Sequence, residues 1–392
     1  MKRKYRIDSI FNISTLLVIL MLLTSCSDIK EVQKLNYATA IGIDYFDDQY
    51  HCYIQMVGLN SIAKTEGSGE NEPQVWVSEA TGKTFNDALF DVYNTAQERI
   101  IWSHVSSIVL GEGAVKEGFE TIFDGMIRYN EFRLTPWVFG TQTDMKELLS
   151  TVGFYNQAAL DTLLHNPTSI YEQSSLIKPV KLQRLAREYY EPTFTTYVPS
   201  VTINSNQWKK NMQDDPKIAY DGAFFFTKDQ YKGFFDLGDL SGLRWITPET
   251  DRTSILISSE GQSQYLIVID DVSLKKEIKK SNQITQFDLK MDVKGYLTNR
   301  NEGTDKSISE ITNRTAEKIE KEIEELFILG RENNTDFLEL EYNLYHREYK
   351  DWKRMIKENY SIVNKKSIQD IQVNVKLNHT GELKNRKIDD RN

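Results

Sequence analysis

Apolar positions along the chain follow two periods, one of two residues and one near 3.6. The period of two occurs at 37–44, 50–59, 74–80, 104–110 and 137–140. Thr84 and Asp87 have the residue types and spacing of a helix cap, and the apolar positions after them predict a helix that continues to Ile100. A second helical period covers 115–127. This alternation predicts an α/β arrangement in the first half of the chain, with helices laid on a sheet.

The second half of the chain is richer in strand patterns. They occur at 223–227, 254–257, 265–269, 287–297 and 371–377. A long helix is predicted after Ser307, which has Glu310 as its cap partner, and a shorter helix is predicted at 351–358. We therefore expect an α+β / α/β multidomain fold, with mixed sheets and packed helices in an N-terminal and a C-terminal domain.

A polar stretch marks the expected boundary between these domains. Residues 204–216 are polar apart from Trp208 and Met212, so 206–217 is predicted to be a linker. It would separate an N-terminal α/β domain at 26–205 from a C-terminal α+β domain at 218–384, with a polar tail at 385–392. Four prolines between 155 and 199 leave open a subdivision near residue 155 and a third, small middle domain.

The first 26 residues have the order of a bacterial lipoprotein signal peptide. Basic residues at the start precede an apolar run at 16–23 that is too short to span a bilayer. Leu23, Thr24 and Ser25 before Cys26 match the lipobox, so residues 1–25 are predicted to be removed and the Cys26 thiol to carry a diacylglyceryl thioether. Long acyl chains such as palmitate on this cysteine would hold the protein at the membrane. The alternative is a secretory signal with an incidental cysteine.

Charge and composition limit the partners. The chain has 48 Lys and Arg and 57 Asp and Glu, for a net charge of −9, and loss of residues 1–25 would change this to −12. An acidic protein is repelled by polyanions, so no nucleic acid partner is expected. After Cys26 no apolar stretch approaches 18 residues, which predicts an ectodomain outside the bilayer. Cys52 would then be the remaining thiol, buried in a strand as an apolar residue.

The sequence contains no recognisable catalytic motif. The five histidines do not have metal-ligand spacing, and no nucleophile elbow, P-loop or dinucleotide-binding glycine motif opens a helix. Adjacent acidic residues such as Asp47 and Asp48 are interpreted as solvated turns. We therefore expect a protein that is not an enzyme and that uses no catalytic residue, metal or cofactor.

Two short clusters combine arginine with aromatic residues, a combination that protein interfaces favour. One spans 128–133, and the other spans 241–246. We take Arg133, Arg244 and Trp245 as candidates for partner contact or for domain positioning. In the alternative, which we favour, Arg133 and Arg244 pair with internal carboxylates or carbonyls and shape the junctions around them.

Several of these segments together resemble the Ger(x)C family, the lipoprotein C subunits of nutrient germinant receptors in endospore-forming bacteria. The resemblance rests on the lipobox with Cys26 and on segments 40–44, 128–133, 242–245 and 345–353, in the family's order. It covers nearly the whole mature chain. The sequence departs from the family at 337–340, where a more apolar turn that contains glycine is common.

The resemblance implies an ectodomain without catalytic activity that acts in spore germination. It would be anchored through Cys26 to the outer face of the spore inner membrane and would assemble with two membrane subunits, A and B. That complex would detect nutrients such as amino acids and trigger the release of ions and dipicolinate. The residues do not indicate which nutrient is detected, or whether this subunit contacts it.

Two other functions are compatible with a lipid-anchored ectodomain. One is the solute-binding component of an ABC importer, which has two lobes around a cleft, although the second half lacks the doubly wound pattern of such a lobe. The other is a membrane-tethered hydrolase, because catalytic groups converge in space rather than in sequence.

Overall fold

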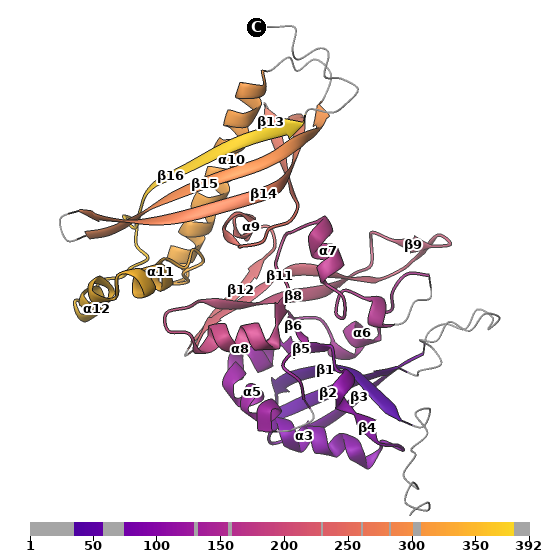
Figure 1. Ribbon diagram of the computed structural model, residues 1–392. Coiled ribbons are helices and arrows are strands. Elements are labelled where there is room, and N and C mark those ends of the chain that lie inside the picture. Colours follow the sequence, from indigo (N-terminus) through magenta and orange to yellow (C-terminus); the bar gives the residue numbers. More distant parts are fainter. Residues whose placement is uncertain are drawn as a thin grey trace, which may run out of the picture.

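Two large β-sheets, each covered by helices, and a two-stranded hairpin make up the described part of this computed structural model (Figure 1). The structure describes residues 35–57, 74–128, 132–155, 159–228, 230–259, 262–281, 284–300 and 307–379. The predicted lipobox, with Cys26, lies outside the described residues, as do the signal peptide and the polar tail. The fold is α+β with mixed sheets, which confirms the fold class expected from the sequence.

The N-terminal sheet is mixed, with a parallel centre and antiparallel edges. Its strand order is β12-β11-β8-β6-β5-β1-β2-β3, and β4 and β7 pair with β1 and β6. The strands are β1 (Asn36–Phe46), β2 (Gln49–Val57), β3 (Val75–Gly82), β4 (Ile100–Ile101), β5 (Ser107–Gly111), β6 (Trp137–Thr141), β7 (Val180–Lys181), β8 (Thr196–Asn204), β11 (Lys217–Thr227) and β12 (Gln230–Asp236). Strands β1, β5, β6 and β8 run parallel to one another.

Helices cover both faces of this sheet because its central strands are buried on both sides. One face packs against α3 (Phe85–Asp91), α4 (Glu112–Glu117), α5 (Phe119–Arg128) and α8 (Leu182–Tyr190), and the other packs against α6 (Met145–Ser150). The connections also contain α7 (Thr168–Gln173) and the 3-10 turns η2 (Val92–Asn94), η3 (Trp102–His104) and η4 (Ala159–Asp161). Thr84 caps α3 by accepting a hydrogen bond from Asp87 N, as the sequence predicts.

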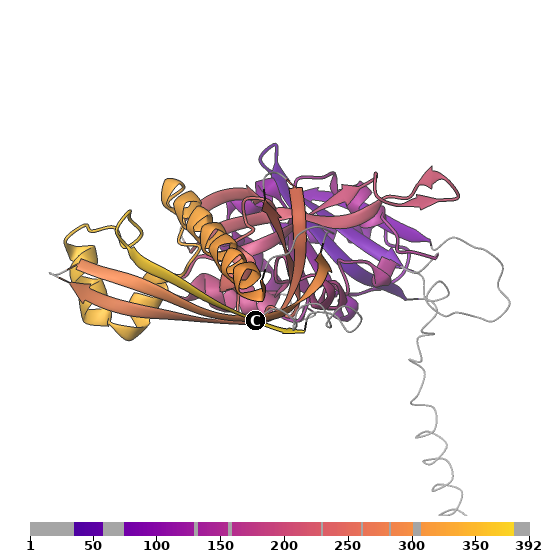
Figure 2. The ribbon, with the colours of Figure 1, turned by 90° about the horizontal axis from the view of Figure 1, so that it is seen from above.

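The C-terminal sheet has the order β13-β14-β15-β16 and is antiparallel except for its last pair. Its strands are β13 (Thr253–Ser259), β14 (Gln262–Ser281), β15 (Ile284–Arg300) and β16 (Ile368–His379). The parallel pair β15 and β16 is joined through α10 (Ile308–Glu332), α11 (Leu340–Arg347) and α12 (Tyr349–Lys357). Helix α10 lies across one face of the sheet (Figure 2), and Ser307 caps it as predicted, by accepting from Glu310 N.

The polar stretch 206–217, expected to be a linker between the domains, instead connects two paired strands of the N-terminal sheet. Strand β11 pairs antiparallel with β8, and the residues between them form a hairpin of β9 (Lys209–Lys210) and β10 (Gln213–Asp214). The sheet therefore continues to Asp236, and the chain passes to the second sheet through 237–252, which contains α9 (Leu243–Ile246). Composition alone does not distinguish the two cases, because a hairpin tip is as solvated as a linker.

Two further elements differ from the predicted ones. The helix expected from Thr84 to Ile100 ends at Asp91, and Ile100 lies in β4, which pairs with the start of β1. Ile100 is buried in that strand, and its spacing from the apolar residues of the helix matches the helical period by coincidence. The strand expected from His104 begins at Ser107, because residues 102–104 form η3. Cys52 is buried in β2 as expected, and burial raises the pKa of its thiol.

Candidate functional site at the junction of the two sheets

The segment 241–246, singled out in the sequence, forms the turn that docks onto α10. Residues 243–246 make the single helical turn α9, and Gly242 lies directly against the backbone of α10. A Cβ atom at Gly242 would lie 2.3 Å from the carbonyl oxygen of Glu322 and 2.9 Å from Cβ of Leu326. Both distances are shorter than real contacts allow, so glycine is what permits α9 to approach α10 this closely.

Glu322 of α10 accepts two hydrogen bonds from this turn. Arg244 Nη2 and Trp245 Nε1 lie 2.8 Å and 2.7 Å from Glu322 Oε2. Arg244 Nη1 also donates to the carbonyl oxygen of Ser254 on β13, at 3.1 Å, and the Arg244 guanidinium lies 4.7 Å from the centre of the Trp245 ring. The side chains of Arg244 and Glu322 are 12% and 9% exposed, and Trp245 is fully buried. This network therefore fixes α9, α10 and β13 to one another.

Three phenylalanine rings connect the two sheets across the junction. The Phe337 ring, which follows α10, meets Phe225 of β11 and Phe235 of β12 edge to face, with ring centres 4.7 Å and 5.0 Å apart. All three are buried and belong to one apolar core that extends from the N-terminal sheet into the C-terminal sheet. Edge-to-face rings stabilise a contact beyond the area that they bury. The two sheets are therefore joined by a shared core and not only by a connecting segment.

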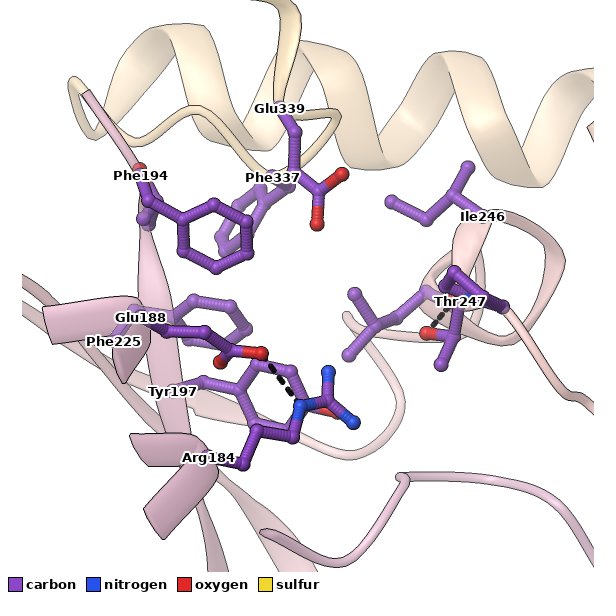
Figure 3. Close-up of a pocket in the computed structure, with 12 residues that line it drawn as sticks. Arg184, Glu188, Phe194, Tyr197, Phe225, Ile246, Thr247, Phe337 and Glu339 are labelled. Atoms are coloured by element: carbon purple, nitrogen blue, oxygen red, sulfur yellow. Dashed lines mark hydrogen bonds and ion pairs between the residues drawn. The ribbon is translucent and has the colours of Figure 1, made fainter. Parts of the chain in front are cut away.

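A hollow opens beside these rings, between α8, β8, α9 and the start of α11 (Figure 3). Its volume is about 390 Å³, which includes space open to solvent. Arg184 Nε lies 2.5 Å from Glu188 Oε1, and Thr196 Oγ1 donates to the other Glu188 oxygen at 2.9 Å. Glu339 points into the hollow from the opposite wall, and Lys276 Nζ lies 2.9 Å from it. Because each of these charged groups already has a partner, the hollow offers little to a charged ligand.

Burial at the junction raises the pKa of two groups. Burial raises the pKa of the Tyr197 hydroxyl, which lines the hollow and donates to the carbonyl oxygen of Lys178 at 3.2 Å. Burial also raises the pKa of Asp336 to about 6, although hydrogen bonds from the backbone N–H groups of Glu341 and Leu340 lower it. Glu341 N lies 2.7 Å from Asp336 Oδ2, so the carboxyl group holds the start of α11.

Polar contacts surround the apolar centre of the junction. His346 Nε2 of α11 lies 2.8 Å from Glu191 Oε1, which follows α8. Phe194 and Tyr342 meet edge to face nearby, with ring centres 4.9 Å apart. An apolar centre with a polar rim is the arrangement of a stable protein interface. The geometry is that of a rigid junction, which makes the relative placement of the two sheets part of the fold.

The structure does not bring the three candidate residues to one place. Arg244 and Trp245 lie in the junction, where Arg244 pairs with the internal carboxylate of Glu322. Arg133 is exposed between α5 and β6, and within the described residues no contact connects it to Arg244 or Trp245. At the other end of its cluster, Arg128 is exposed and pairs with Asp124, one helical turn earlier. A role for any of them in partner contact stays a prediction.

Segment 40–44 has a structural function that the sequence analysis did not assign. The Asp44 carboxylate, at the end of β1, accepts hydrogen bonds from the N–H groups of Tyr45 and Ala114, at 2.8 Å and 3.2 Å. It thereby holds the start of α4. A Cβ atom at Gly111 would lie 2.1 Å from the Asp44 carboxylate, and one at Gly113 would lie 2.0 Å from the Tyr45 carbonyl oxygen. Burial raises the pKa of the Asp44 carboxyl group, although hydrogen bonds from backbone N–H groups lower it.

A serine and a histidine that are distant in sequence lie together on the other face of the N-terminal sheet. Ser106 Oγ lies 2.6 Å from His165 Nδ1, and His165 Nε2 lies 3.0 Å from Gln55 Oε1. Gln55 Oε1 accepts, so Nε2 carries the proton and Nδ1 accepts from the Ser106 hydroxyl. Burial lowers the pKa of His165 to about 4, whereas a general base works best with a pKa near the operating pH. The pair is therefore a buried hydrogen bond between a hydroxyl and a neutral imidazole.

Sequence reasoning missed Glu322, Glu188 and Phe337. Glu322 lies three residues after Ile319 and directly before Ile323, both fully buried. That position on the edge of the apolar stripe was the available signal.

Across the residues that the structure covers, no group of three or more His, Cys, Asp or Glu side chains is placed to hold a metal ion. Within the same residues, no helix is both long and apolar enough to cross a membrane.

Comparison with known families matches both halves of the chain. The family described as "Spore germination protein N-terminal domain" matches residues 28–203, and the family described as "Spore germination B3/ GerAC like, C-terminal" matches residues 221–381. The gap between the two matches contains the β9–β10 hairpin. The two matches together cover most of the chain.

Curated relatives come from Bacillus subtilis (strain 168). Spore germination protein KC is 22% identical over 363 residues, covering 87% of this chain and 89% of its own, and spore germination protein B3 is 22% identical over 352 residues, covering 86% and 89%. The putative spore germination protein YfkR is 25% identical over 226 residues, which span 56% of each chain. The crystal structure of the GerBC protein has the same fold, with a TM-score of 0.55 and 17% identity over 89% of this chain and 100% of that chain.

Proposed function

The chain belongs to the family of spore germination proteins that these two domains define, and we propose that it is the lipid-anchored subunit of a spore nutrient germinant receptor. The observation that carries the proposal is the match of both family domains, in order, between residues 28 and 381. The relatives KC and B3 align over 89% of their own length, so the likeness extends over most of each chain. The proposal assigns no catalytic step to the chain.

The proposed anchor is a lipid on Cys26, at the outer face of the spore inner membrane. The lipobox of Leu23, Thr24 and Ser25 before Cys26 supports it, because small residues before the cysteine suit cleavage at that point. A tether of this kind raises the effective concentration of the ectodomain beside membrane partners, so contacts of modest affinity suffice for assembly. The proposed partners are the membrane-embedded A and B subunits of the receptor.

The shared core at the junction suits assembly better than opening and closing around a solute. A solute-binding protein of an ABC importer has two doubly wound lobes and a cleft that closes on its ligand. Here the second sheet, β13 to β16, is mainly antiparallel, and Phe225, Phe235 and Phe337 fill the space between the sheets. This arrangement favours a rigid ectodomain that presents fixed surfaces to its partners.

Metabolic labelling tests the anchor. Cells that express the chain and its Cys26→Ala variant would be grown with an alkyne-tagged palmitate, and label would be compared in the purified proteins. We expect label and membrane association for the unaltered chain and loss of both for Cys26→Ala, with Cys52→Ala as the matched control that keeps both. Equal labelling of the unaltered chain and Cys26→Ala would contradict the proposed anchor.

Germination tests the receptor role. Spores that lack the gene for this chain, or that carry Cys26→Ala, would be exposed to individual nutrients. The release of dipicolinate would be followed over time. We expect slower or absent release in response to at least one nutrient. Normal release for every nutrient tested would contradict a receptor role.

A further inference from the structure

The β9–β10 hairpin and the loop beside it hold apolar side chains out into solvent. Met212, at the tip of the hairpin, is 84% exposed, and Tyr155 is 95% exposed. Trp208, at the start of the hairpin, is 47% exposed. Single exposed apolar residues are ordinary on protein surfaces, but three large ones on a hairpin and the loop next to it are a candidate interaction site.

The backbone at the tip disfavours the residue that occupies it. Asn211 and Met212 form the two-residue turn of the hairpin, with φ angles of 52° and 70°. A turn with two positive φ angles suits Asn followed by Gly, because only glycine adopts this conformation without strain from a Cβ atom. Methionine at the second position therefore costs stability. The cost is understandable if the exposed thioether side chain has a function of its own.

The base of the hairpin is held in place, so the tip is presented in a fixed position. The rings of Trp208 and Phe154 meet edge to face with centres 4.9 Å apart, and Lys217 Nζ lies 4.9 Å from the centre of the Phe154 ring. Asp215 N donates to the carbonyl oxygen of Trp208 at 2.9 Å, and Lys217 pairs with Asp215 at 2.5 Å. This support also brings the loop with Tyr155 next to the hairpin.

We propose that Met212, Trp208 and Tyr155 insert into the surface of the bilayer that carries the lipid on Cys26, an inference that rests on the proposed anchor. Eight residues separate Cys26 from residue 35, so the extended connection reaches about 30 Å at most. In Figures 1 and 2 the hairpin extends toward the same side of the molecule as the start of β1. Insertion requires the tethered protein to turn this side toward the membrane.

Size and charge favour a bilayer over a protein as the occupant. A hairpin tip with two neighbouring aromatic rings presents a small, convex surface, whereas a stable protein interface buries about 800 Å² on each partner. Trp and Tyr with a nearby Lys are typical of the membrane–water interface. Lys209 and Lys217 are paired with Asp214 and Asp215, so insertion depends on apolar contact and not on anionic lipid.

A fluorescent label at the tip tests this inference on the full, lipid-anchored chain. Met212→Cys would be labelled with an environment-sensitive dye, because Cys52 is buried and acylation would consume Cys26. The protein would be reconstituted into phosphatidylcholine vesicles that contain nitroxide-labelled lipid, with Lys357→Cys on the exposed surface of α12 as the control. We expect at least twofold stronger quenching at position 212 than at position 357.

A second variant separates function from folding. Met212→Gly should unfold at the same or a higher temperature than the unaltered chain, because the turn loses its strain. A dye attached to Tyr155→Cys should be quenched several-fold less when Met212→Gly is also present than when Met212 is retained. Equal quenching at 212 and 357, or no effect of Met212→Gly, would overturn the inference with the anchor intact. Failure of the unaltered chain to float with the vesicles would overturn the anchor and this inference together.

Discussion

A single carboxylate, that of Glu322, holds the turn between the two sheets. It accepts from both Arg244 and Trp245, and all three side chains are shielded from solvent. Removal of one member of a buried ion pair leaves the other charge without compensation, which costs far more than loss of an exposed pair. The arginine and tryptophan of segment 241–246 therefore depend on a residue almost 80 positions later in the chain.

Glu322→Ala should lower the free energy of unfolding by about 3–5 kcal/mol, because the Arg244 guanidinium and the Trp245 N–H lose their acceptor. Urea denaturation followed by fluorescence measures the effect. Glu325→Ala, which removes an exposed carboxylate paired with Lys321 on the same helix, is the control and should change stability by less than about 1 kcal/mol. Similar effects of the two substitutions would contradict the role assigned to Glu322.

Asp336 gives the junction a pH dependence whose sign follows from its raised pKa. Its pKa in the folded protein is about 6, above the value of about 3.9 in an unfolded chain, so the fold favours the protonated carboxyl. The contribution of that proton to stability is complete below pH 4 and is lost as pH rises through 6. Asp336→Asn accepts the same backbone hydrogen bonds without a charge.

The stability of Asp336→Asn relative to the unaltered chain should therefore increase by on the order of 3 kcal/mol between pH 4 and pH 7. Urea denaturation at several pH values in this range measures the difference, and changes common to both proteins cancel. A difference that stays constant with pH, or that falls as pH rises, would refute the assignment.

At the scale of elements, helix caps and the apolar faces of helices are well predicted from the sequence. Ser307 caps α10, and the apolar positions after it form the buried stripe of that helix, because capping and periodicity are local properties. The hairpin at β9 and β10 was not foreseen, because its existence depends on the pairing of β8 with β11. Ile100 was misassigned to a helix for the same reason, since its burial comes from β4 pairing with β1.

The approach of α9 to α10 makes Gly242 the most restrictive position of that element. Gly242→Ala would place a Cβ atom 2.3 Å from the carbonyl oxygen of Glu322, so the two helices must separate. We expect a loss of about 1–3 kcal/mol in the free energy of unfolding. Gly238→Ala, four residues earlier, meets nothing within 4 Å and is the matched control. If both alanines are tolerated equally, the contact does not set the distance between the helices.

At the scale of the whole molecule, the core continues from one sheet into the other through Phe225, Phe235 and Phe337. A shared core couples the stabilities of the two sheets, so the described structure should unfold in one cooperative transition. Phe337→Ala, with an expected loss of about 3–5 kcal/mol, should separate the transition into two. Leu256→Ala, on the exposed side of β13, should not. Two transitions in the unaltered chain, seen by calorimetry, would contradict the coupling.

The junction shows what a sequence conveys about a site and what it does not. Arg244 and Trp245 attract attention because arginine and tryptophan are enriched among the residues that dominate interfaces, and both are found at a contact between elements. Phe337 has no local signature, and the sequence signals Glu322 only by its position at the edge of the apolar stripe of α10. The function of both residues appears only when α10 is folded back over the second sheet. Arg133 is also an arginine beside an aromatic residue, but it is exposed. Residue type alone does not predict which neighbours a side chain will have in the folded protein.

Co-purification from membranes tests the central claim, that this chain is a subunit of a germinant receptor, most directly. The unaltered chain and Cys26→Ala would be isolated from detergent-solubilised spore membranes, and the proteins bound to each would be identified by mass spectrometry. The account predicts two multi-pass membrane subunits with the unaltered chain, and their loss or strong reduction with Cys26→Ala. Recovery of an ABC permease, or of no membrane partner, would contradict it.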